Sequence, residues 1–282
     1  MVADPHSPLI LHPLSALDVI FQAVHTQGID TTALAALLDQ SGLFTALVES
    51  LLNVKDSAVV LGFIVALLAR IAFIMDETPL FLELVRATGH RLYGPHGDVA
   101  QMALRPLITC MCSRVETMAS SRKRKTTALG LASLLCRCPD DLQAPLFAEL
   151  SAMIGVWLDL IGDGRPEASD DATAPLLPTA PPSSPLLSRA PSHAVELRAP
   201  SPPPSIPGLE GLDEEDEFQE TSPGRARMTE LYRMDPVNTL RLTTFVREGM
   251  HKAQERHGAV LHASFAHVDP LVLELFQKDL RC

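Results

Sequence analysis

The 282-residue sequence has few aromatic residues, with ten Phe, two Tyr and one Trp. Leu, Ala and Val therefore supply most of the apolar mass, which favours helices over a sheet-rich fold. Basic residues are not in excess either, because the formal net charge is −11. This balance argues against a broad nucleic-acid-binding face. The first residues, MVADPHSPLILHPL, have no basic region and no small-residue cleavage site, so no secretory signal is expected.

Signatures of catalysis are also missing. No Gly-rich phosphate loop follows a strand, no Ser or Cys lies in a nucleophile elbow, and no His/Glu pair has zinc spacing. The tightest cluster is His90, His96 and Asp98, in the segment GHRLYGPHGD. We interpret it as a turn between helices in which Asp98 caps the next helix, with a metal or catalytic loop as the alternative. The sequence therefore predicts no enzyme activity, no cofactor and no bound metal.

The cysteines do not predict disulfide bonds. Their number is odd, and without a secretory signal they are expected to stay reduced in the cytosol or nucleus. Four of them form two Cys-x-Cys pairs, and residues two apart on a helix point roughly 200° apart, which suits small core residues better than a shared metal ion. The five positions are Cys110, Cys112, Cys136, Cys138 and Cys282.

Between residues 9 and 161 the chain divides into helical runs separated by turns that contain Gly, Pro and Asp. Apolar residues recur every three or four positions, as at Leu104, Leu107, Ile108 and Met111, so each helix needs neighbours to cover one face. Helix pairs return at roughly 40-residue intervals, which predicts an all-α solenoid of HEAT/armadillo-like hairpins. A compact helical bundle is the alternative. The expected helices are 14–26, 31–39, 42–52, 57–75, 78–92, 99–117, 124–137 and 142–161.

One of these runs also has the length of a membrane span. Residues 57–75 are largely apolar and carry a single charge, Arg70, and about 20 such residues cross a bilayer. An arginine in the hydrocarbon costs about 2.5–3.5 kcal/mol, and the neighbouring amphipathic helices need a partner. We therefore expect a buried solenoid helix and no membrane insertion, with a single-pass membrane protein as the alternative.

The helical pattern stops after Gly162. Residues 163–224 hold 13 of the 23 prolines and a net charge of −9, which predicts a disordered Pro-rich and acidic linker between a repeat domain, 1–162, and a carboxy-terminal helical cap, 225–282. The linker ends in an acidic run that is either a solubilising loop or a tether that binds basic proteins. The candidate protein-binding residues in this run are Asp213, Glu214, Glu215, Asp216 and Glu217. The basic run at 122–125 is expected to be a solvated helix start, with a localisation signal or a contact for an acidic partner as alternatives.

The last segment of the chain contains two sequence signals for the start of a helix. Asp235 and Pro236 open the first helical stretch, and Asp269 followed by Pro270 predicts a second helix to about residue 281. Apolar residues lie at helical spacing in this second helix and predict its buried face. The predicted face consists of Val272, Leu275, Phe276 and Leu280.

The same segment, MDPVNTLRLTTFVREGM and onward, resembles the carboxy-terminal part of the importin-β (karyopherin-β) family of nuclear transport receptors. The resemblance rests on Asp235-Pro236-Val237, Thr239, Leu242, Phe245 and Val246, and the upstream segment KTTALGLASLL is similar to the family's helical repeats. It implies a receptor that shuttles between nucleus and cytoplasm and binds basic protein cargo, Ran-GTP and the Phe-Gly repeats of nucleoporins. The chain is much shorter than such receptors and resembles their last repeats. A helical scaffold without transport activity is the alternative function.

Overall fold

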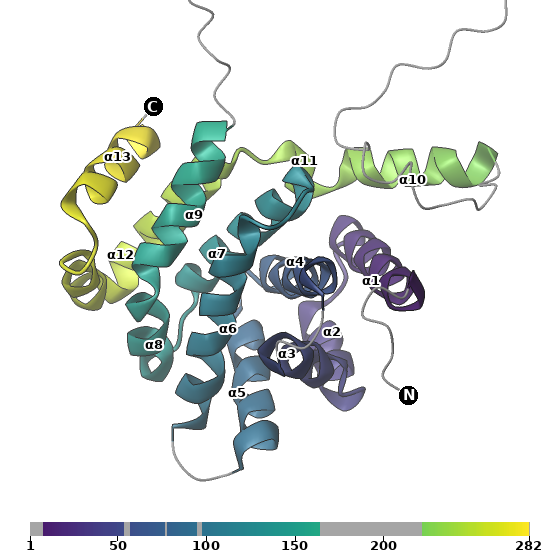
Figure 1. Ribbon diagram of the computed structural model, residues 1–282, viewed down its shortest axis with the longest axis horizontal. Helices are drawn as coiled ribbons and strands as arrows, with labels where there is room; N and C mark the ends of the chain where they lie inside the picture. The colour runs from purple at the N-terminus through teal and green to yellow at the C-terminus, as the bar shows by residue number, and fades with distance from the viewer. Residues whose placement is uncertain (1–7, 54–56, 77, 95–97, 164–221, 282) are drawn as a thin grey trace, which may run out of the picture.

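The computed structural model describes residues 8–53, 57–76, 78–94, 98–163 and 222–281, and all regular structure in these ranges is helical (Figure 1). The expected all-α fold is therefore confirmed. A short 3-10 turn, Asp140–Leu142, precedes α8. The helices are α1 (Pro8–Gln27), α2 (Thr31–Gln40), α3 (Leu43–Asn53), α4 (Ala58–Ile74), α5 (Leu80–Tyr93), α6 (Val99–Val115), α7 (Ser121–Cys136), α8 (Gln143–Ala148), α9 (Leu150–Asp163), α10 (Ser222–Met234), α11 (Pro236–Thr239), α12 (Leu242–Phe265) and α13 (Pro270–Arg281).

Local sequence explains where several helices begin. Gly28 ends α1 with a φ of 63°, and the Asp30 side chain accepts a hydrogen bond from the Thr32 backbone N–H at the start of α2. Asp98 caps α6 in the same way, as predicted. The cap of α4 is Ser57 rather than an aspartate, and the turn before α8 has no side-chain cap at Pro139.

Helix α4 lies at the centre of the helical stack (Figure 1). It packs against α1, α3, α6 and α7, and every residue from Ile64 to Ile74 is buried. With 17 residues, α4 is too short to cross a membrane as a single helix. No other single helix in the described ranges is long and apolar enough to do so. Two bent helix pairs are long and apolar enough by length and composition alone. The first pair is α2 and α3, and the second joins the segment from the 3-10 turn to the end of α8 with α9.

Helices α4 and α7 cross at very short range. Gly130 of α7 lies so near Ala69 of α4 that a Cβ atom at Gly130 would be 2.3 Å from the Ala69 backbone oxygen. This position requires glycine because any side chain would enter the backbone of the neighbouring helix. The two helices therefore form a tightly packed pair around which the other helices are arranged.

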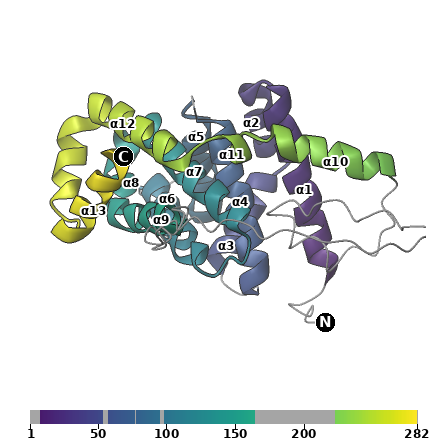
Figure 2. The same ribbon diagram turned by 90° about the horizontal axis from the view of Figure 1, so that it is seen from above.

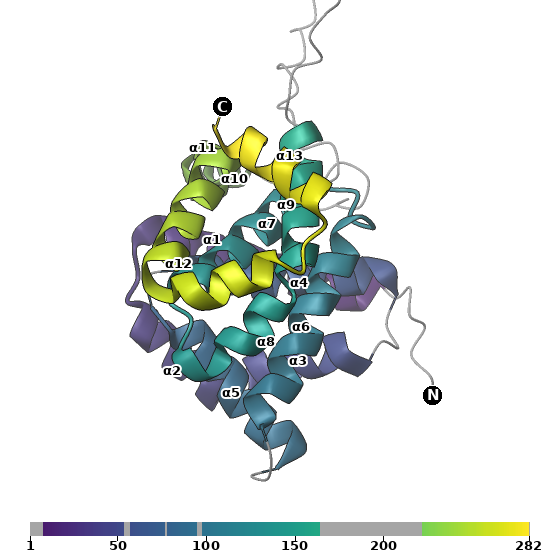
Figure 3. The ribbon, with the colours of Figure 1, turned by 90° about the vertical axis from the view of Figure 1, so that its left-hand side faces the viewer.

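Helices α10–α13 run lengthwise along the stack (Figure 2). α10 contacts α1, α11 contacts α7, α12 crosses α7, α8 and α9, and α13 packs on α9. Figure 3 shows α12 and α13 covering the end of the stack that α8 and α9 form. The predicted division into domains at residue 225 remains a prediction, but regular helix already begins at Ser222.

One detail of the predicted face of α13 is wrong. Phe276 is 2% exposed and stacks on Trp157 of α9, as a core residue should. Leu275, which was expected beside it in the core, is 53% exposed. Adjacent residues point about 100° apart on a helix, and the contact with α9 and α12 covers only one side of α13.

Candidate functional site

The most elaborate polar arrangement in the described structure joins four helices through two arginines and two aspartates. Arg70 of α4 donates from Nη1 and Nη2 to the two carboxylate oxygens of Asp235, at 3.2 and 3.1 Å, and from Nε to Asp18 of α1 at 2.9 Å. Arg122 of α7 donates to the same Asp235 carboxylate at 2.6 Å and lies 3.7 Å from Asp18. We call these four residues the ion-pair network.

Burial makes this network electrostatically strong. Arg70 is 1% exposed, and the Asp235 side chain is completely buried. Burial alone would raise the pKa of Asp235, but Arg70 and Arg122 outweigh it and hold that pKa below its usual value. Burial would likewise lower the pKa of Arg70, but Asp18 and Asp235 raise it. Both groups are therefore charged at neutral pH, and their opposite charges balance inside the protein.

Asp235 also has a backbone role. Its carboxylate accepts a hydrogen bond from the Val237 N–H at 3.1 Å and so caps the short helix α11. Pro236 occupies the first helical position, where no N–H is needed. The sequence predicted this helix start, but it did not predict that the same carboxylate meets Arg70 and Arg122.

The basic run at the start of α7 is part of this arrangement. Arg122 packs over the Tyr232 ring, with 5.2 Å between its guanidinium carbon and the ring centroid. The Lys123 ammonium lies 2.8 Å from the centroid of the Phe63 ring, and burial lowers the pKa of Lys123 to about 8. The expectation of a simply solvated basic run is therefore wrong for these two residues, which hold α7 against α10 and α4.

Other predicted positions have plainer outcomes. Asp98 accepts a hydrogen bond from the Gln101 N–H, as the turn interpretation requires, whereas His96 lies outside the described residues. The acidic candidates also lie outside them, so their role in binding stays a prediction. These candidates are Asp213, Glu214, Glu215, Asp216 and Glu217.

The cysteines in the described ranges are free thiols. Cys112, Cys136 and Cys138 are buried, and burial raises the pKa of Cys112 and Cys138 to about 12. These thiols stay protonated at neutral pH, which makes them poor nucleophiles and poor metal ligands. Within the part of the chain that the structure describes, no group of three His, Cys, Asp or Glu side chains is placed to hold a metal ion.

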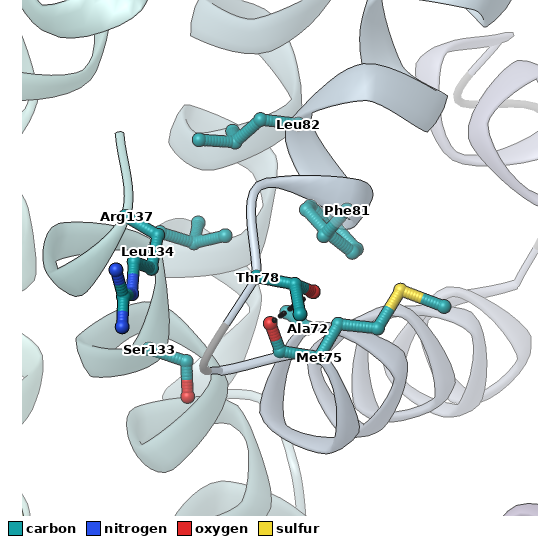
Figure 4. Close-up of a pocket in the computed structure, with 8 residues that line it drawn as sticks. All are labelled: Ala72, Met75, Thr78, Phe81, Leu82, Ser133, Leu134 and Arg137. Carbon is teal, nitrogen blue, oxygen red and sulfur yellow. Dashed lines mark hydrogen bonds between the residues drawn. The ribbon is translucent and has the colours of Figure 1, made fainter. Parts of the chain in front are cut away.

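A small hollow lies between α4, α5 and α7, beside the turn that joins α4 and α5 (Figure 4). It has room for about one water molecule. Thr78, Ser133 and Arg137 supply polar groups to its wall, but the Thr78 hydroxyl already donates to the Met75 carbonyl. The hollow is far too small for a metabolite or cofactor.

The surface that remains for partners is the outside of the helical stack. Several large apolar side chains are exposed on the described helices, and the largest exposed fraction among them is that of Leu271 on α13, at 72%. Such side chains contribute to protein contacts, which are non-covalent. The others are Ile20, Ile29, Leu37, Val59, Tyr93, Met102, Met234, Leu240 and Leu275.

The residue that sequence reasoning missed most clearly is Asp18. The sequence did give one signal, because an arginine in an otherwise apolar helix needs a buried carboxylate. It did not say which carboxylate, since Asp18 and Asp235 lie 52 and 165 positions from Arg70. Tertiary structure alone brings them together.

Comparison with known proteins places this fold in a family. No curated protein and no solved structure matches the chain. One family description, importin-11-like TPR repeats, matches residues 8–281 and so covers nearly the whole sequence. It agrees with the expected resemblance and with the stacked helices, although it describes the repeats as TPR where the sequence suggested the HEAT type. The chain therefore belongs to the importin-11-like family of helical-repeat proteins, within the importin-β group of nuclear transport receptors.

Proposed function

We propose that the chain acts as the cargo-binding part of a nuclear transport receptor. The observation that carries the proposal is the family match over residues 8–281. The fold supports it because a helical-repeat stack offers a long surface to other proteins. The proposed action is non-covalent binding, without catalysis.

The proposed partners are a basic protein cargo, Ran-GTP and the Phe-Gly repeats of nucleoporins. A cargo rich in Lys and Arg meets the acidic residues 213–217 first, because opposite charges attract over about 8 Å at physiological salt. Ran-GTP then releases the cargo if the two favour different forms of the stack or share part of its surface. Such a receptor shuttles between cytoplasm and nucleus.

The experiment measures binding of a fluorescent Lys/Arg-rich peptide to the full chain by anisotropy, at 50 and 300 mM salt. The matched variant replaces Asp213, Glu214, Glu215, Asp216 and Glu217 by the corresponding amides, which preserves their shape and removes their charge. We expect the wild-type affinity to fall at least about tenfold between the two salt concentrations and the variant to bind weakly at both. Equal binding by the two proteins would contradict the role of the acidic run.

A second measurement separates transport from scaffolding. Fluorescent full-length chain is added to permeabilised cells with an energy source and Ran, and accumulation at the nuclear rim and in the nucleus is followed. We expect rim staining that an excess of Phe-Gly repeat peptide reduces. Uniform cytoplasmic staining, with normal helical circular dichroism, would favour a scaffold without transport activity.

A further inference from the structure

The four carboxy-terminal helices, α10–α13, run along the stack from end to end, and we call them the brace. Its two halves differ in how deeply they are buried. Their path runs from α1 at one end of the stack to α9 at the other (Figure 2). One half, α12 and α13, is packed deeply: Val246 and Ala253 are fully buried, and Gly249 brings α12 close to the backbone of α7, with a Cβ atom there only 3.3 Å from the Ala132 oxygen. This half has the burial of a permanent part of the core.

In the other half, α10 and α11, it is α10 that is attached lightly. None of the described side chains of α10, residues 223–234, is buried, and Figures 1 and 2 both show the helix projecting past α1. A 13-residue helix with no buried face is marginal on its own. Its contact with α1 includes one hydrogen bond, from the Gln22 side chain to the Leu231 carbonyl at 2.9 Å.

Polar groups at the junction between α10 and α11 supply the attachment that apolar burial does not. Asp235 inserts its carboxylate between Arg70 and Arg122, and the Arg122 guanidinium covers the Tyr232 ring. Val237 is the buried apolar side chain of α11. Withdrawal of Asp235 leaves two arginines facing Asp18 alone, so the position of this half depends on one carboxylate.

We propose that α10 and α11 are a releasable latch, locked by Asp235, on a brace whose other half is permanent. Because Arg70 and Arg122 also bind Asp18, the latch is shared with α1 and joins the first and last parts of the described chain. Release leaves α12 and α13 seated on α7, α8 and α9 and frees the end of the stack that contains α1. This device is independent of which cargo or nucleotide-bound partner the protein takes.

Hydrogen exchange on the full chain tests the latch in two ways. In the wild-type protein, at low guanidinium concentrations, we expect peptides covering 228–240 to open at least about 100-fold more readily than peptides of α4 and α7. In Asp235→Asn, whose amide still caps α11, the same peptides should approach unprotected rates, at least about 100-fold faster than in the wild type, while α4 and α7 stay protected. A suitable probe is the Leu240 N–H, which donates to the Pro236 carbonyl at 2.9 Å.

The matched control is Glu230→Gln on the same helix. Glu230 pairs with Arg233 on the exposed surface and not with the ion-pair network. Exchange of residues 228–240 should therefore change less than about threefold. The proposal is overturned if these residues exchange in the wild type only together with α4 and α7, or if Asp235→Asn leaves their rate unchanged. Loss of protection throughout Asp235→Asn also overturns it, because the carboxylate is then part of the core rather than a latch.

Discussion

The crossing of α4 and α7 allows a sharp test of the packing, by adding one methyl group. Gly130→Ala places a Cβ atom 2.3 Å from the Ala69 backbone oxygen and 2.7 Å from the Ala69 Cα. Contacts of this length do not occur between such atoms, and the obstacle is helix backbone, which cannot rotate away as a side chain does. The two helices must therefore move apart along a buried interface.

The expected magnitude combines two opposing effects. Replacing glycine by alanine inside a helix gains about 1 kcal/mol of helix propensity. Overpacking a core costs about 1–3 kcal/mol and sometimes more, and backbone contacts belong at the upper end. We expect a net loss of roughly 2 kcal/mol in the free energy of unfolding, which lowers the Tm by roughly 4–8 °C for a structured region of this size.

Gly155→Ala is the matched control. Gly155 lies inside α9, and a Cβ atom there meets nothing within 4 Å. The same substitution should raise the free energy of unfolding by about 0.5–1 kcal/mol and the Tm by a few degrees. Thermal unfolding followed by circular dichroism measures both variants. A Gly130→Ala protein as stable as the wild type, or as stable as Gly155→Ala, would refute the close crossing.

Two further predictions concern His25 and α13. Burial, and then Arg70, lower the pKa of His25 to about 4, so the unfolded chain binds this proton more readily and stability is lost as the pH falls from about 6.5 towards 4. Allowing for the partial exposure of His25, the loss in the free energy of unfolding is roughly 1–2 kcal/mol. Urea unfolding measured across this pH range should show a smaller pH dependence of stability in His25→Gln than in the wild type. An equal pH dependence in the two proteins would mean that another group titrates. On α13, Leu275→Lys should change the free energy of unfolding by less than about 0.5 kcal/mol, whereas Phe276→Ala should lower it by about 3–5 kcal/mol. A similarly large loss in Leu275→Lys would restore the face that the sequence predicted, in which Leu275 and Phe276 are both buried.

Local sequence predicts much of this fold because its signals act within a few residues. Asp269 accepts a hydrogen bond from the Leu271 N–H, so the start of α13 was readable from Asp269 and Pro270 alone. The apolar stripe of α6 was readable for the same reason, and Leu104 and Met111 are fully buried. Such signals need no knowledge of which helix lies opposite.

The site was less predictable because it depends on distant partners. Nothing near Arg70 in the sequence indicates that its two carboxylates come from α1 and α11. Helix α10 was placed partly in the linker because it has no buried face of its own to produce an apolar stripe. Leu275 was assigned to the core because helical spacing gives the side of a helix but not how much of it a neighbour covers.

The charge of Arg70 has a structural consequence beyond stability. Buried ion pairs often stabilise a protein little compared with apolar residues of similar size, because desolvation offsets the attraction. Helix α4 is otherwise apolar and offers little that distinguishes one neighbouring helix from another. Arg70 supplies that distinction, because only a helix that brings a carboxylate to its position can pack there without leaving a buried charge unpaired. The arginine therefore selects α1 and α11 as neighbours and fixes where the carboxy-terminal helices return to the stack.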